Sequence, residues 1–172
     1  EFLQLQDRVD LTLCLFRSTT PYQDAFMNGT AKRNMRRKAR RVALQVLYEV
    51  DASKHTLEDS LRWVLERTRL DKKNIAFVNQ LVEQVIIHSN DLDKEIEHFA
   101  TSWPLVQVPV VDRNILRIAF YEMEKSSETP PKVAINEAVE LAKYFGSAGS
   151  QRFVNGVLGM LMQHHSDDLV TK

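Results

Sequence analysis

Residues 130–161 read PPKVAINEAVELAKYFGSAGSQRFVNGVLGML, and this stretch carries the clearest information about the fold. Apolar residues recur there at intervals of three and four, which is the period of an α-helix with one buried face. Gly146 is predicted to end the first helix as a left-handed C-cap, and Ser150 to cap the second. The apolar positions are Ile135, Ala138, Val139, Ala142 and Phe145, then Phe153, Val154, Val157, Leu158 and Leu161.

The same helical period extends along most of the preceding sequence. Thr56, Asp71, Asp112 and one of Asn90 and Asp91 stand where N-caps of further helices are expected. No segment alternates apolar and polar residues between hairpin turns, as strands would. The sequence therefore predicts an all-α fold with about seven helices joined by short connections.

Composition limits the class of protein. The chain has 172 residues, of which 44% are hydrophobic and 27% charged, with a single cysteine. That is enough apolar sequence for one domain core without covalent cross-links. One thiol excludes a disulfide within the chain, so a cytoplasmic location is expected. The apolar runs are far shorter than the roughly 20 residues of a bilayer-crossing helix, so no membrane contact is predicted.

Charge is distributed unevenly, although 23 Lys and Arg balance 23 Asp and Glu. The sequence KRNMRRKARR at residues 32–41, called the basic segment below, holds seven bases and no acid. Residues 1–31 carry two bases and four acids, and residues 42–172 carry 14 bases and 19 acids. The chain thus combines a cationic segment with an acidic body. The basic segment is interpreted as a phosphate-contacting arm, with a solvated helix end and a sorting signal as alternatives.

Residues 1–31 lack sustained periodicity and contain Pro21, an Asn28-Gly29 pair and the lone Cys14. We predict that they form an N-terminal extension that is disordered or non-native, with Met27 as a natural start. Residues 32–166 are predicted to form the helical domain, and residues 167–172 a C-terminal tail.

No catalytic centre is evident in the sequence. The five glycines are scattered rather than gathered in a phosphate-binding loop. The acidic pairs Asp91/Asp93 and Glu95/Glu97 suit a helix start, where carboxylates interact favourably with the helix dipole. The histidines do not show the i,i+4 spacing with a third ligand that a zinc site would use. The chain is therefore predicted not to be an enzyme and to need no cofactor or metal.

Three blocks of the sequence closely resemble the NusB family of bacterial transcription antitermination factors. They are RRKARRVALQVLYEVD at residues 36–51, RNILRIAFYEME at residues 113–124, and the opening stretch at residues 130–161. Gly149, where many members have an acid, and Gln107-Val108, where Arg-Leu is common, depart from the family pattern. The polar and glycine positions that carry the resemblance, and that packing alone would not dictate, are Asn136, Glu137, Lys143, Gly146, Ser150, Asn155 and Gly156.

The resemblance implies a fold of two packed three-helix sub-bundles and a protein that binds the boxA element of nascent RNA. It implies NusE, a small ribosomal-subunit protein, as the partner in that binding. It further implies loading onto RNA polymerase with other Nus factors, in support of antitermination during ribosomal RNA synthesis. Whether a homodimer forms is left open by the sequence.

Single-stranded RNA is bound by cations at the phosphates and by flat side chains on which bases stack. The basic segment would supply the cations, and the resemblance places Tyr48 and Phe153 on the RNA-facing side. The alternatives are a core position for Phe153, a partly buried ring for Tyr48, and ordinary helix capping for residues 150–152. The predicted RNA-binding residues are Lys32, Arg33, Arg36, Arg37, Arg40, Arg41, Tyr48, Ser150, Gln151, Arg152 and Phe153.

The resemblance also places the NusE contact on the fourth to sixth helices. Asp112, Glu137 and Glu140 would there meet a basic partner, and the alternative is a solvated acidic face. Two rival functions remain open. One is the NusB-like domain of certain ribosomal RNA cytosine methyltransferases, whose further α/β domain is not expected here. The other is a protein-interaction module without specific RNA recognition.

Overall fold

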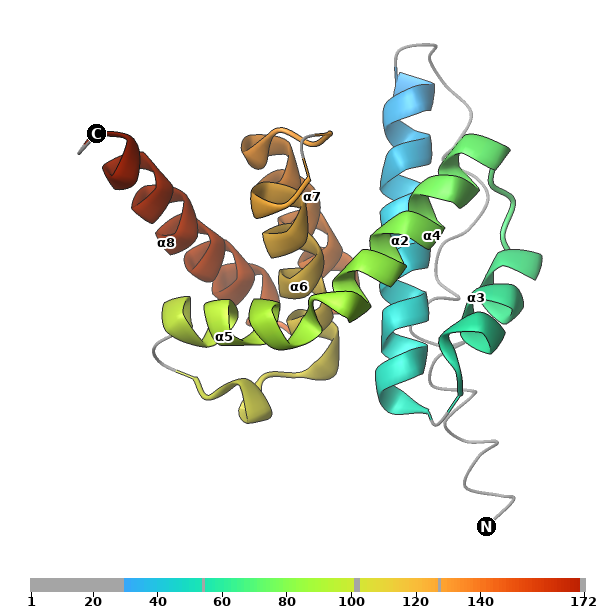
Figure 1. Cartoon of the computed structure of the whole chain (residues 1–172), viewed down its shortest axis with the longest axis horizontal. Helices are drawn as coiled ribbons and strands as arrows, with labels where there is room; N and C mark the ends of the chain where they lie inside the picture. Colours follow the sequence, from blue (N-terminus) through green and yellow to red (C-terminus); the bar gives the residue numbers. More distant parts are fainter. Residues whose placement is uncertain (1–29, 54, 101–102, 127, 171–172) are drawn as a thin grey trace. The chain divides into compact units, whose positions relative to one another are not determined.

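The computed structural model describes residues 30–53, 55–100, 103–126 and 128–170. Within these ranges the chain is helical and contains no strand, which confirms the all-α prediction of about seven helices (Figure 1). The predicted N-terminal extension lies outside the described residues except for its last two positions. The elements are α2 (Thr30–Ala52), α3 (Leu57–Glu66), α4 (Lys72–Ile87), α5 (Ser89–Phe99), the 3-10 helix η2 (Leu105–Gln107), α6 (Val110–Glu124), α7 (Pro131–Phe145) and α8 (Ser150–Val170).

The chain divides into two compact units, which confirms the prediction of two sub-bundles. The boundary lies between Asn79 and Gln80, inside α4. The first unit contains α2, α3 and the first half of α4, and the second contains the rest of α4 with α5, η2, α6, α7 and α8. None of the described helices is long and apolar enough to cross a membrane.

The first unit is built on α2, which packs against α3. Apolar residues at helical spacing on α2 are buried, and Val64 of α3 is buried as well. This burial removes their side chains from water, which is the main force that stabilises such a helix pair. The buried apolar residues of α2 are Ala39, Val42, Ala43, Leu44, Val46 and Leu47.

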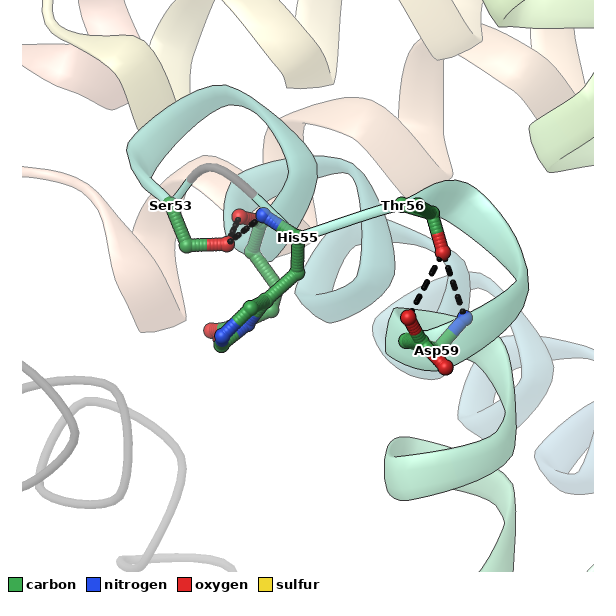
Figure 2. Close-up of polar contacts among 5 residues, drawn as sticks. Ser53, His55, Thr56 and Asp59 are labelled. Atoms are coloured by element: carbon green, nitrogen blue, oxygen red, sulfur yellow. Dashed lines mark hydrogen bonds and ion pairs between the residues drawn. The ribbon is translucent and has the colours of Figure 1, made fainter.

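Local hydrogen bonds end α2 and begin α3, as Figure 2 shows. The Ser53 hydroxyl donates to the Glu49 carbonyl at 2.6 Å, and the His55 N–H donates to the Ser53 hydroxyl at 3.2 Å. The Thr56 hydroxyl accepts the Asp59 N–H at 3.2 Å and donates to the Asp59 carboxylate at 2.9 Å. The predicted Thr56 cap is therefore confirmed, with both bonds confined to the first turn of α3.

Asp71 is confirmed as a cap in the same way, because its carboxylate accepts the Asn74 N–H at 2.8 Å. The cap predictions for the next two helices are wrong. Helix α5 begins after His88, which makes no side-chain capping bond. Helix α6 begins after Pro109, which fixes its own φ and precedes the helix in place of a polar cap. Asp112 lies inside the first turn of α6.

Helix α6 is the centre of the second unit and packs against α5, α7 and α8. A helix surrounded on several sides is apolar around most of its circumference rather than along one stripe. The polar Arg117 lies among these buried residues and needs a partner. Its guanidinium donates to Asp93 of α5 at 2.6 and 2.7 Å and to Asn114 at 3.1 Å. The buried apolar residues of α6 are Ile115, Leu116, Ile118, Ala119, Phe120 and Tyr121.

A pair of carboxyl groups joins α5 and α6 in this unit. Burial first, then a hydrogen bond with Glu124 and the charge of Glu124, raise the pKa of Glu95 from 4.5 to about 7. The Glu124 carboxylate also lies 3.4 Å from Nε2 of His165 in α8. Between about pH 4.5 and pH 7 we therefore expect the folded chain to hold a proton at Glu95 that the unfolded chain has released.

The expected consequence is a stability that falls as pH rises from about 4.5 to about 7, because the folded state binds more protons across that window. Replacing Glu95→Gln removes the titrating group and should flatten this part of the profile. Urea unfolding at pH 5 and pH 8 measures the difference. Glu97→Gln, at an exposed position of the same helix, is the control that should leave the profile unchanged. If wild type and Glu95→Gln lost the same free energy of unfolding between pH 5 and pH 8, the raised pKa of Glu95 would be contradicted.

Candidate nucleic-acid interface

The basic segment forms the first turns of α2, so its basic residues belong to an ordered helix. Lys32 and Arg33 belong to this helix, and their side chains lie outside the described residues. Arg36, Arg37 and the other described cations of the segment are half-buried, with the exception of Arg40. The segment is therefore not a uniformly exposed array of charge.

Phe77 of α4 divides the cations into two groups. The Arg36 guanidinium lies 4.1 Å from the centre of the Phe77 ring, and that of Arg40 lies 5.6 Å from it. Such contacts are attractive because the ring face is electron-rich. Arg40 is only 5% exposed, so little of its side chain is at the surface, and its contact with RNA stays a prediction. Sequence reasoning missed Phe77, since no local pattern reports a contact between residues so distant along the chain.

The second group lies along another line of α2. Arg37 and Arg41 are separated by four residues, and Tyr48 lies seven residues further on. Residues at these spacings share one face of an α-helix. All three side chains are half-buried. This face, called the Arg37–Tyr48 face below, combines two guanidinium groups with one aromatic ring.

The start of α8 carries the remaining predicted RNA contacts, in the second unit. Gln151 and Arg152 are exposed there, and Phe153 is half-buried. Ser150 is only 1% exposed, so its hydroxyl is not offered to a phosphate as predicted. Ser150 is instead the first residue of α8, and the Gly149 carbonyl accepts the Phe153 N–H at 3.0 Å.

The Ser150 hydroxyl is used inside the protein. It donates to Oδ2 of Asp112 at 2.7 Å and accepts the Ser147 N–H at 2.7 Å. Asp112 is 3% exposed, and burial raises the pKa of its carboxyl while the Ser150 hydrogen bond lowers it. Asp112 is therefore a buried acid that faces α8, and its contact with a partner stays a prediction.

Of the other two predicted partner contacts, Glu137 is 4% exposed and thus is not part of an exposed acidic face. Glu140, one turn further along α7, is half-buried. Their role toward a partner stays a prediction. No group of three or more His, Cys, Asp or Glu residues in the described ranges could hold a metal ion.

Gly146 is needed for space rather than for backbone freedom. Its φ of −86° and ψ of 177° are extended, so the predicted left-handed cap is wrong. A β-carbon at this position would overlap the Ser150 side chain and lie 2.6 Å from the Ala142 carbonyl oxygen. Only a residue without a side chain lets α7 turn so closely into α8.

Replacing Gly146→Ala should therefore destabilise the protein by about 2 kcal/mol, because the clash falls partly on backbone. Urea unfolding measures this change. Gly149→Ala is the matched control, since a β-carbon there meets nothing within 4 Å. Equal stability of the two variants would show that the close approach at Gly146 is not required.

Comparison with known proteins gives consistent results. The model of the NusB family matches residues 37–163. Transcription antitermination protein NusB of Dehalococcoides mccartyi (strain CBDB1) is 45% identical over 132 residues, which cover 77% of this chain and 92% of the relative. The protein of the same name from Roseiflexus sp. (strain RS-1) is 43% identical over 136 residues, covering 78% and 96%.

Solved structures agree with these relatives. T. maritima NusB has a TM-score of 0.66 and 33% identity, covering 72% of this chain and 87% of that one. A structure of the antitermination factors NusB and NusE in complex with dsRNA has a TM-score of 0.69 and 25% identity, covering 76% and 98%. These matches confirm the resemblance and, with it, the prediction that the chain is not an enzyme. The chain belongs to the NusB family of transcription antitermination proteins.

Proposed function

We propose that this protein binds single-stranded RNA of the boxA type together with NusE and joins RNA polymerase with other Nus factors during ribosomal RNA synthesis. The observation that carries the proposal is the Arg37–Tyr48 face of α2. Two cations and one ring on a rigid helix supply the phosphate and stacking contacts that unpaired RNA uses. The similar structure that contains NusB, NusE and dsRNA supports both kinds of partner.

The start of α8 supports the same proposal from the second unit. Arg152 adds a cation and Gln151 adds an amide, and both side chains are exposed. Phe153 is half-buried, so part of its ring is accessible to a base. The backbone N–H groups of a helix start also favour an anion nearby.

For NusE, we propose a contact on α7 that includes Glu140. The chain outside the basic segment and the first 31 residues has five more acids than bases. An acidic surface of this kind speeds the encounter with a basic protein and selects against acidic ones. Glu137, one turn before Glu140 on the same helix, is buried.

A titration with a boxA-like RNA and a scrambled RNA of equal length tests the proposal. The measurement is made with and without NusE over a range of salt concentrations. We expect the boxA-like RNA to bind more tightly, with the larger difference when NusE is present. Equal affinity for both RNAs under all conditions would mean that the protein binds RNA through its positive charge alone. That result would favour the protein-interaction module without specific RNA recognition.

A further inference from the structure

Asp112 and Ser150 were expected on two different surfaces, and the structure joins them directly. Ser150 Oγ donates to Asp112 Oδ2 at 2.7 Å, and both residues are more than nine-tenths buried. The two residues are separated by 38 positions in the sequence. The bond therefore connects the first turn of α6 to the first turn of α8.

This bond also orients the turn before α8. A hydroxyl has one hydrogen, so when Ser150 donates it to Asp112 its lone pairs are left to accept other hydrogens. One of them accepts the Ser147 N–H at 2.7 Å, and Ser147 Oγ lies 3.1 Å away. Gly146 allows the close approach of Ser150 from the other side. Asp112 thus sets the direction of a hydroxyl that, together with the bond from the Ser150 N–H to the Ser147 carbonyl at 3.0 Å, holds the Ser147–Ser150 turn.

Burying the Asp112 carboxylate costs free energy, and in return its side chain makes one hydrogen bond to the Ser150 hydroxyl. Its second oxygen, Oδ1, is buried and has no hydrogen-bond partner among the described residues. A buried, incompletely paired carboxyl costs stability when it is ionised. A role in stability alone thus explains this acid poorly, whereas a role in holding the adjacent turn explains it directly.

We propose that Asp112 is a positioning residue for RNA binding, which acts by holding the Ser147–Ser150 turn and thereby the first turn of α8. Gln151, Arg152 and Phe153 follow this turn without a break, so their placement depends on it. This inference rests on the proposed function for its effect on RNA. It assigns Asp112 to RNA binding by the start of α8 rather than to the contact with NusE.

The binding test compares Asp112→Ala, Asp112→Asn and Ser150→Ala. Asp112→Ala and Ser150→Ala each remove the bond, so each should weaken RNA binding about tenfold, and the double variant should be no weaker than either. Asp112→Asn keeps an oxygen that can accept from Ser150 and should retain most of the affinity. Because no cation is removed, the slope of log affinity against log salt should fall by no more than the roughly 0.7 that loss of the single Arg152 phosphate contact would give.

The changes in affinity for RNA and for NusE separate a positioning role of Asp112 from two other roles. If Asp112 acted only by repelling phosphates, both substitutions would tighten RNA binding. If Asp112 contacted NusE, Asp112→Asn and Asp112→Ala would weaken NusE binding equally and leave the affinity for RNA alone unchanged. Either result would overturn the proposal. Glu97→Gln, at an exposed position on α5, is the control for loss of one acid.

Hydrogen exchange of the Ser147 amide tests the positioning without RNA. We expect this amide to be protected in wild type and in Asp112→Asn, and to exchange faster in Ser150→Ala and Asp112→Ala. Ser150→Ala is a small change, so it keeps the test decisive even if Asp112→Ala does not fold. Equal exchange in every folded variant would overturn the proposal. A wild-type protein that binds no RNA but shows the expected exchange pattern would contradict the proposed function alone.

Discussion

Replacing Arg37 and Arg41 together by Ala should lower the affinity for boxA-like RNA by at least about tenfold at low salt. It should also reduce the slope of log affinity against log salt by about 1.4, since each lost phosphate contact on a single strand accounts for about 0.7. Both side chains lie on the Arg37–Tyr48 face and belong to one helix, so the loss removes two neighbouring cations. Fluorescence titration at four or more salt concentrations measures both quantities.

Two control variants separate contact from overall charge. Arg62→Ala with Arg69→Ala removes two exposed arginines from the same unit and should leave the slope unchanged. Arg36→Ala with Arg40→Ala removes the pair that lies over Phe77, so its main effect should be on the unfolding midpoint. If that pair changed the salt slope as much as the Arg37 and Arg41 pair, the division of the basic segment into two groups would be refuted.

Replacing Asp93→Ala should destabilise the protein by about 3 kcal/mol, which is the second large effect that we expect. The substitution leaves the Arg117 guanidinium largely buried without its bidentate carboxylate partner, and an uncompensated buried charge is costly. The side chain of Arg117 is 11% exposed and that of Asp93 is 26% exposed, so solvent replaces the lost bonds only in part. The midpoint of urea unfolding gives the change.

Asp91→Ala provides the matched control on the same helix. Asp91 lies 3.9 Å from Lys94, and both side chains are well exposed. A surface pair of this kind contributes less than about 1 kcal/mol, so the midpoint should move little. A loss for Asp93→Ala no larger than for Asp91→Ala would mean that the ion pair between α5 and α6 does not stabilise the second unit.

The predictions that proved correct concern interactions between residues close together in the sequence. Thr56 and Asp71 were identified as caps because each accepts an N–H three residues ahead. Seven of the ten apolar positions expected inside α7 and α8 are buried, because helical periodicity is itself a local property, whereas Ile135, Val139 and Phe153 are half-buried. The all-α class follows from these patterns together.

The features that the sequence did not reveal concern mainly residues whose partners are distant in sequence, and Gly146, whose neighbour Ser150 is four residues away, is the exception. Asp112 stands at a plausible cap position, but its carboxylate bonds to Ser150, which is 38 residues away. Gly146 stands at a plausible left-handed position, but it is extended and is required by the side chain of Ser150. Arg40 belongs to the most cationic segment of the chain, but it is buried beside Phe77. Polarity in the sequence does not reveal which acids and bases become buried.

The sequence alone determined the helical class, the division of charge into a cationic segment and an acidic body, and the family, because these depend on composition, period and short motifs. Only the tertiary structure decided which charges are accessible. It separated Arg37 and Arg41 from Arg40, and it moved Asp112 from a presumed surface to the base of α8. The physical reason is that burial and hydrogen bonding are set by contacts between helices, which bring together residues that the sequence keeps far apart.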